Sequence, residues 1–156
     1  MGVATGYRPI WVAHFDMTGP GNSSAGWSMQ TGVERSNVEG NPSPPCIVLR
    51  QPGAWRFRWQ VNTGSQTISI YCKQAINLAP FPSMVIKADP SLGVAADIVG
   101  ISAGGAGWVK IGPLTAVATS PGVLWVELRA NYMGQDASSA NPLGPWYPCY
   151  FDNVDI

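Results

Sequence analysis

Two segments near the middle of the chain alternate strictly between apolar and polar residues. Residues 55–61 read Trp-Arg-Phe-Arg-Trp-Gln-Val, and residues 67–73 read Thr-Ile-Ser-Ile-Tyr-Cys-Lys. A period of two is typical of a β-strand with one buried and one solvated face. The residues between the two segments include Asn62 and Gly64, which favour tight turns. The pattern therefore predicts an antiparallel hairpin over residues 55–73.

The phase of this alternation predicts which side chains the hairpin buries. When Val61 is paired with Ile68, the apolar residues of both segments fall on one face. The opposite phase would bury two arginines, which is costly. Trp55 and Trp59 are therefore expected in the core, not on a surface that stacks against a sugar.

The outward face of the hairpin is a candidate ligand-binding surface, where polar donors beside a tyrosine would contact a glycan or a neighbouring subunit. Its residues are Arg56, Arg58, Gln60, Tyr71 and Lys73. The same register places Arg56 opposite Lys73, and like charges at that spacing are destabilising. Either an acidic partner lies beside this pair or the register is wrong. The alternative is an ordinary solvated face, which is the norm for antiparallel sheets.

Further apolar runs separated by turn residues predict the other strands. They cover residues 10–16, 46–50, 83–88, 108–111, 122–130 and 150–156, with a short strand from Trp27. Residues 94–101 form a strand or an irregular segment, and no amphipathic helix of ten or more residues stands out. Many short strands in 156 residues predict one domain, residues 1–156, with an all-β fold, an antiparallel β-sandwich of the jelly-roll kind.

Composition and charge argue against several classes of function. The formal net charge is zero and only 12% of residues are charged, so the chain lacks the basic surface that binds nucleic acid. No apolar stretch approaches the length of a membrane-spanning helix, so we expect no membrane partner. The first residues have no basic region leading into an apolar core, so we expect no signal peptide.

The candidate catalytic residues do not form a set. Residues 100–104 spell the Gly-x-Ser-x-Gly of a nucleophile elbow, which needs a helix after it and a histidine later in the chain. More glycines follow instead, and the single histidine, His14, comes earlier. The nine acidic residues are scattered, and no pair has a spacing that indicates a shared site. The protein is therefore predicted not to be an enzyme.

Three cysteines allow at most one disulfide within the chain. Cys72 is in phase with the apolar positions of its segment, which predicts a small buried residue. Cys46 and Cys149 remain, and the sequence does not establish whether they pair. No Cys-x-x-Cys spacing is present, so we expect no zinc site.

A long loop before the last strand is a candidate interface. Residues 131–148 are rich in Gly, Pro, Ser and Asn, and a loop of this length in a compact domain is usually functional or disordered. The loop nevertheless carries apolar residues, several of them of types enriched in interface cores. These are Tyr132, Met133, Leu143, Trp146 and Tyr147. We favour a contact with another protein over a flap that packs on its own domain.

A series of landmarks follows a consistent order along the chain. They are Phe15-Asp16, Gly26-Trp27, the alternating segments of 55–73, the Trp-Val-Lys-Ile of 108–111, the Gly-Val-Leu-Trp-Val of 122–126 and the Tyr-Phe-Asp-Asn-Val of 150–154. This order resembles the galactose-binding-like jelly roll, the fold of many carbohydrate-binding modules. The resemblance spans most of the chain and rests on the order, since each motif alone is weak. Asn153 departs from it, because a second acid is common at that position.

The resemblance also implies a structural calcium site. In such jelly rolls, acids near the first and last strands hold calcium together with backbone carbonyls, and here these acids are Asp16 and Asp152. Calcium takes about six to eight oxygen ligands, of which the sequence names only two or three. The alternative is that both aspartates end strands or cap turns, and that the protein has no cofactor.

Two functions of different classes are consistent with these features. The first is a non-enzymatic virion structural protein, a bacteriophage capsid decoration or accessory shell protein. Such a protein would sit on the capsid surface after assembly in the host cytoplasm, with capsid or other virion proteins and copies of itself as partners. Low charge, the missing export signal and the missing catalytic set favour it, while the fold-level analogy to virion domains is weaker. The alternative is a carbohydrate-binding module that recognises a glycan on the outer face of the 55–73 hairpin.

Overall fold

The computed structural model describes residues 33–36, 46–49, 53–135 and 147–155. Within these ranges the chain forms nine β-strands and a short 3-10 helix, η3 (Pro90–Leu92). The strands are β1 (Val33–Ser36), β2 (Cys46–Leu49), β3 (Gly53–Val61), β4 (Gly64–Gln74), β5 (Ser83–Ile86), β6 (Ile98–Ile101), β7 (Val109–Ala118), β8 (Gly122–Ala130) and β9 (Cys149–Asp155). The strands predicted at residues 10–16 and from Trp27 lie outside the described residues. β1 was not predicted, because its Val-Glu-Arg-Ser sequence is short and mostly polar.

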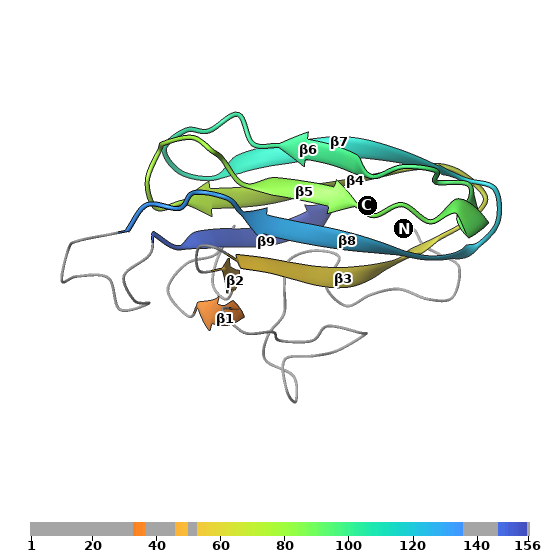
Figure 1. The fold of residues 1–156 in the computed structure, drawn as a ribbon, viewed down its shortest axis with the longest axis horizontal. Coiled ribbons are helices and arrows are strands. Elements are labelled where there is room, and N and C mark those ends of the chain that lie inside the picture. The colour runs from red at the N-terminus through yellow and green to blue at the C-terminus, as the bar shows by residue number, and fades with distance from the viewer. Residues whose placement is uncertain (1–32, 37–45, 50–52, 136–146, 156) are drawn as a thin grey trace.

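The strands form two antiparallel sheets that enclose one apolar core (Figure 1). Sheet A has the strand order β1-β2-β9-β4-β7, and sheet B has the order β3-β8-β5-β6. Strands that are neighbours in space are mostly distant in sequence, as in other sandwiches with long connections. The predicted all-β antiparallel sandwich is therefore confirmed.

The predicted hairpin over residues 55–73 is wrong. β3 pairs with β8, whereas β4 pairs with β7 and β9, so the two alternating segments lie in different sheets. Asn62 and Thr63 carry the chain from one sheet to the other, and the Asn62 amide donates to Gln66 Oε1 at 2.7 Å. Alternation reports which side chains are buried, but it does not report which strand is the hydrogen-bonded neighbour.

The apolar faces of β3 and β4 meet across the core instead of side by side. Their buried members are Trp55, Phe57, Trp59, Val61, Ile68, Ile70 and Cys72. The prediction that Trp55 and Trp59 are core residues is confirmed, with 0% and 2% of each residue exposed. Full burial of a large apolar side chain contributes about 2–3 kcal/mol, so these residues account for much of the stability of the sandwich.

A local irregularity in sheet A requires a glycine. The register between β4 and β7 shifts between Ile68 and Ile70, where β7 has an additional residue. Gly112 of β7 has a φ of 97°, and a Cβ atom there would lie 2.9 Å from the Ile68 carbonyl oxygen. Only glycine combines this backbone conformation with such a close approach.

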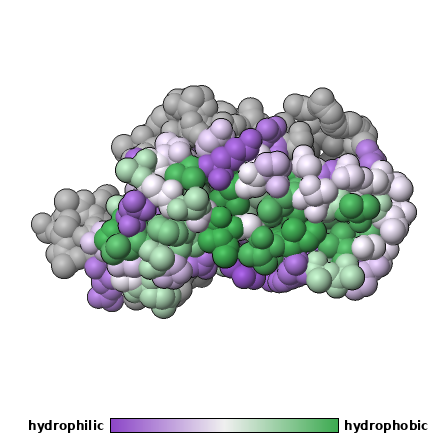
Figure 2. All heavy atoms as spheres, turned by 90° about the horizontal axis from the view of Figure 1, so that it is seen from above, coloured by the Kyte–Doolittle hydropathy of each residue, from purple (hydrophilic) through white to green (hydrophobic). Residues whose placement is uncertain are grey.

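The edges of the two sheets lie together along one side of the molecule, where β6 ends sheet B and β7 ends sheet A. Figure 2 looks onto this side and shows hydrophobic residues gathered along it. Exposed apolar residues of these two edge strands are Val99 and Ile101 in β6 and Val117 in β7. Pro113 in β7 lacks an amide donor, which makes this edge a poor template for pairing with a further strand. Within the described residues, no helix is long and apolar enough to cross a membrane.

The three cysteines are all buried, and none of them forms a disulfide. The question of a pair between Cys46 and Cys149 is thereby answered, because both are thiols. Cys72 is buried as its phase predicts, and burial raises the pKa of its thiol to about 11. Burial likewise raises the pKa of Cys149 well above its ordinary value, and the nearby thiols of Cys72 and Cys46 add to this effect.

Candidate functional site

The outer face of sheet B consists of the residues that alternate along each strand with the buried core residues. In β3 they are Ala54, Arg56, Arg58 and Gln60, and in β8 they are Val123, Trp125, Glu127 and Arg129. The register sets these residues in rows across the two strands. β5 adds Ser83 and Val85 to the rows, in register with Arg129 and Glu127. Backbone hydrogen bonds between the strands fix the Cα and Cβ atoms of each row, so the sheet is a rigid support for these side chains.

Trp125 is the large aromatic side chain of this face, and it is 44% exposed. Arg58 is its cross-strand neighbour in β3. On the other side the Lys87 amide donates to the Trp125 carbonyl oxygen at 2.8 Å, so Lys87 follows β5 beside it. Residues directly opposite in an antiparallel pair hold their Cβ atoms about 5 Å apart. Trp125 therefore has a cationic residue opposite it on each of the two neighbouring chain segments.

Glu127 connects two arginines in the next rows. Its Oε1 accepts a hydrogen bond from Arg56 Nε at 2.7 Å, and its Oε2 accepts one from Arg129 Nε. The Glu127 side chain is only 10% exposed, against 48% for Arg56 and 37% for Arg129. Burial acts to raise the pKa of Glu127, but the hydrogen bonds from both arginines outweigh it and hold that pKa below its ordinary value. Glu127 is thus a carboxylate at neutral pH.

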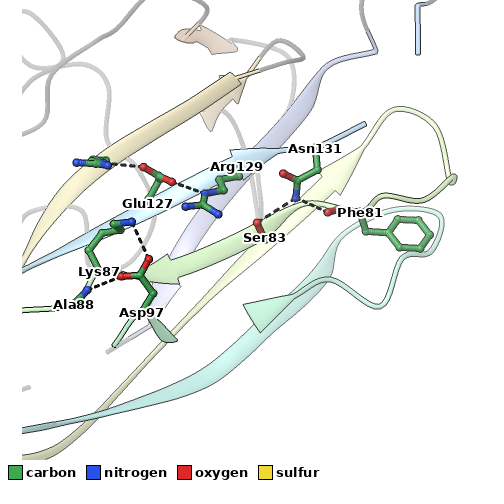
Figure 3. A network of polar contacts seen from close by, with 9 residues as sticks. Phe81, Ser83, Lys87, Ala88, Asp97, Glu127, Arg129 and Asn131 are labelled. Atoms are coloured by element: carbon green, nitrogen blue, oxygen red, sulfur yellow. Dashed lines mark hydrogen bonds and ion pairs between the residues drawn. The ribbon is translucent and has the colours of Figure 1, made fainter. Parts of the chain in front are cut away.

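A second ion pair joins Lys87 Nζ to Asp97 Oδ2 at 2.9 Å (Figure 3). The other oxygen of Asp97 accepts a hydrogen bond from the Ala88 amide at 2.7 Å. The hydrogen bond from Lys87, followed by that from Ala88, lowers the pKa of Asp97 below its ordinary value. Both carboxylates near Trp125 are therefore ionised and already paired.

Asn131 ties the end of β8 to the start of β5. Its side-chain nitrogen donates to the Phe81 carbonyl oxygen at 2.8 Å and to Ser83 Oγ at 3.1 Å (Figure 3). Because Ser83 is in register with Arg129, these hydrogen bonds stabilise the pairing of β5 and β8 at the end of the outer face that carries Arg129.

The five residues predicted to line one ligand-binding surface do not do so. Arg56, Arg58 and Gln60 lie on the outer face of sheet B, whereas Tyr71 and Lys73 alternate with core residues of β4 and face outward from sheet A. The like-charge conflict expected between Arg56 and Lys73 does not arise, because β3 and β4 are not paired. The acidic partner of Arg56 is Glu127.

The loop of residues 131–148 is described only at its two ends. Tyr132 and Tyr147 contact each other, with ring centroids 5.9 Å apart and planes inclined at 63°, and Met133 is 57% exposed. Leu143 and Trp146 lie outside the described residues. The two tyrosines therefore meet within the domain, and the contact of this loop with another protein stays a prediction.

The predicted calcium ligands are not brought together within the described residues. Asp16 lies outside them, and Asp152 is fully buried in β9 opposite Tyr71 of β4. In the described part of the chain no group of three or more His, Cys, Asp or Glu side chains is arranged to hold a metal. The calcium site stays a prediction.

The Gly-x-Ser-x-Gly motif of residues 100–104 runs from β6 into a loop, and no helix follows it in the described residues. The Ser102 hydroxyl accepts a hydrogen bond from the Gly104 amide at 3.1 Å and is also hydrogen-bonded to Cys72. The motif thus has a local structural role, as expected for a turn. His14 lies outside the described residues.

Sequence reasoning missed Trp125, although the sequence carries a signal for it. In residues 122–130 the core positions are Leu124, Val126, Leu128 and Ala130. Trp125 is in phase with Glu127, which predicts that the indole points outward with that polar neighbour. The signal is weak, because only Glu127 and Arg129 of residues 122–130 are charged.

Comparisons with known proteins yield similar structures but no related sequence. No family model matches the chain, and no curated protein matches it. A carbohydrate-binding module of Cellvibrio mixtus lichenase 5A, solved with cellotriose, is 12% identical with a TM-score of 0.48, over 94% of this chain and 98% of that one. TmCBM61, solved with β-1,4-galactotriose, is 8% identical with a TM-score of 0.43, over 81% of each chain. At such identities and scores, neither structure indicates what this protein binds.

Proposed function

We propose that this protein binds carbohydrate through the outer face of sheet B, with Trp125 as the stacking platform. The observation that carries this proposal is the 44% exposed indole of Trp125 in the middle of a β-strand, with Arg58 beside it in the sheet. A large aromatic residue usually buries most of its surface. One held outward on a rigid sheet, among polar side chains, is typical of a recognition surface.

The chemistry of this face suits a sugar ring. The indole offers a flat apolar surface of the kind that packs on the C–H groups of a pyranose. Around it, Arg58, Gln60 and Lys87 supply hydrogen-bond donors to hydroxyl and ring oxygens. An apolar platform surrounded by a few polar groups is the general design of a small-molecule site.

The same face favours binding over catalysis. Its two carboxylates, Glu127 and Asp97, are both in ion pairs, and both have pKa values below their ordinary values. Glycoside hydrolysis needs a carboxylic acid that is still protonated near neutral pH. Neither carboxylate meets that need, so we infer a binding function without hydrolysis.

Affinity electrophoresis through gels that contain single polysaccharides tests the proposal. The wild-type protein is expected to be retarded by at least one polysaccharide, and Trp125→Ala is expected to lose at least about tenfold in affinity. Val117→Ala is the matched control, because it removes an exposed apolar side chain from sheet A. Thermal unfolding of each variant checks that the fold is retained.

Two outcomes would contradict the proposal. One is a folded wild-type protein that is retarded by no polysaccharide in a broad panel of neutral and acidic polymers. The other is a Trp125→Ala variant that binds as tightly as the wild type. Either result would return the capsid-decoration prediction to first place, and binding to purified capsids would then be the next measurement.

A further inference from the structure

The outer face of sheet B has donors to offer a ligand, and its carboxylate acceptors are already engaged. Both oxygens of Glu127 accept hydrogen bonds from arginines, and both oxygens of Asp97 accept hydrogen bonds from Lys87 and Ala88. Arginine and lysine side chains can donate but cannot accept. Around Trp125 a ligand therefore meets mainly donors, with the Gln60 side-chain oxygen as an acceptor, so a ligand rich in acceptors suits this face.

Arg58 differs from the other cations of this face because, among the described residues, its guanidinium contacts no carboxylate. Arg56 and Arg129 share Glu127, and Lys87 is paired with Asp97. The Arg58 side chain makes no hydrogen bond or ion pair within the described part of the chain, and its cross-strand neighbour is Trp125. A guanidinium beside an indole is thus available to a ligand that stacks on that indole.

The charge of this face also differs from that of the whole chain. Four cationic side chains (Arg56, Arg58, Lys87 and Arg129) stand against two carboxylates, whereas the chain has nine basic and nine acidic residues. The surplus is two positive charges: one in the group that Arg56, Arg129 and Glu127 form, and one on Arg58 in the row of Trp125. Such a local positive field attracts anionic ligands.

We infer that the sugar bound at this face carries a carboxylate, and that Arg58 contacts it. This inference rests on the proposed carbohydrate-binding function and names the class of its ligand, an acidic polysaccharide built of uronic acids. The planar guanidinium donates two parallel hydrogen bonds to a carboxylate. With Cβ atoms about 5 Å apart, Arg58 reaches the carboxylate of the same ring that stacks on Trp125.

Polygalacturonate and its fully methyl-esterified form provide a matched pair of probes, because they share a backbone and differ in charge. Isothermal titration in about 0.15 M salt is expected to show at least about tenfold tighter binding of the charged polymer, since charge-assisted hydrogen bonds are the strong ones. Arg58→Gln is expected to reduce this preference to less than about threefold. Lys110→Gln, which removes one charge from the exposed surface of sheet A, is the matched control and keeps the preference.

Other anionic polymers test whether the protein recognises a carboxylate on a sugar or any negative charge. Poly-glutamate carries carboxylates without sugar rings, and equal binding to it would overturn the inference in favour of general attraction to polyanions. Dextran sulfate, if preferred over polygalacturonate, would overturn the choice of carboxylate. Alginate and hyaluronan extend the test to other uronic acids, and the inference is wrong if none of the three uronic-acid polymers binds more tightly than a neutral polysaccharide.

The outcomes also distinguish this inference from the proposed function. If neutral glycans bind as tightly as acidic ones and Trp125→Ala abolishes both, the binding function stands and the acidic ligand is wrong. If Arg58→Gln keeps the full preference for the charged polymer, Arg58 is not the contact. If no glycan binds, or if binding ignores Trp125→Ala, the proposed function itself fails.

Discussion

Arg58 and Trp125 lie directly opposite each other in the antiparallel pair of β3 and β8, and both point away from the core. The two residues are 67 positions apart in sequence, yet the register makes them neighbours. A planar cation beside an exposed indole provides hydrogen bonding and apolar contact at one point of a rigid sheet. This relationship defines the candidate site, and neither segment reveals it alone.

The first prediction concerns the pairing of β3. Arg56→Gln and Glu127→Gln are expected to be non-additive, with a coupling of about 0.5–1 kcal/mol in urea unfolding, because their side chains form a partly exposed ion pair. Arg56→Gln and Lys73→Gln are expected to be additive, since they lie on opposite outer faces. Coupling between Arg56 and Lys73 instead would support the hairpin that the structure excludes.

The second prediction is a pH dependence that comes from Glu127. Its pKa in the folded protein lies below the ordinary value of 4.5, so its pairing stabilises the fold fully above about that pH. This contribution is lost as the pH falls through the folded pKa. The stability difference between wild type and Glu127→Gln, about 1 kcal/mol at pH 7, should shrink as the pH falls below 4.5. Urea midpoints across this range measure it, and a constant difference would contradict it.

The third prediction concerns the irregularity between β4 and β7. Gly112→Ala is expected to destabilise the protein by about 2–3 kcal/mol, because alanine is strained at positive φ and its Cβ would meet the Ile68 carbonyl oxygen. Gly107→Ala is the matched control, since Gly107 has a φ of 92° but no atom within 4 Å of the added Cβ. Gly107→Ala should lower the free energy of unfolding only by the backbone strain of alanine at positive φ, about 1 kcal/mol. Equal costs in chemical denaturation would show that the close approach is absent.

The fourth prediction is that all three cysteines are thiols that react only when the protein opens. Cys46, Cys72 and Cys149 are buried, and burial raises the pKa of Cys72 to about 11, so little of it is thiolate at pH 8. A thiol reagent at pH 8 should give no fast phase with the native protein and three equivalents after unfolding. A single equivalent after unfolding, with no reductant, would show a disulfide.

Much of the fold follows from the sequence. The alternation of residues 55–61 and 67–73 correctly predicts which tryptophans are buried, because a period of two assigns each side chain to one face of a strand. β2, β5 and β8 lie where apolar runs and turn residues predict them. β7 extends beyond the predicted residues 108–111, because Gly112 and Pro113, of residue types that usually interrupt a strand, are accommodated as an irregularity within it.

The sequence predicts only part of the candidate site, namely the outward-facing residues of β3. Arg56, Arg58 and Gln60 were correctly predicted to face outward, but the sequence assigned them the wrong neighbours in Tyr71 and Lys73. A two-residue link between alternating strands is compatible with a hairpin and with a crossing between sheets. The choice depends on contacts with β8, β7 and β9, which lie far away in the chain.

By itself, the sequence determined most of the described strands, the buried face of β3 and β4 and therefore the β-sandwich, because these depend on the local order of apolar and polar residues. Only the tertiary structure decided that β3 and β4 belong to opposite sheets, that Glu127 is the partner of Arg56, and that Arg58 stands beside Trp125. Strand pairing is a choice among distant segments with similar patterns, and it is settled by how all the apolar faces close around one core.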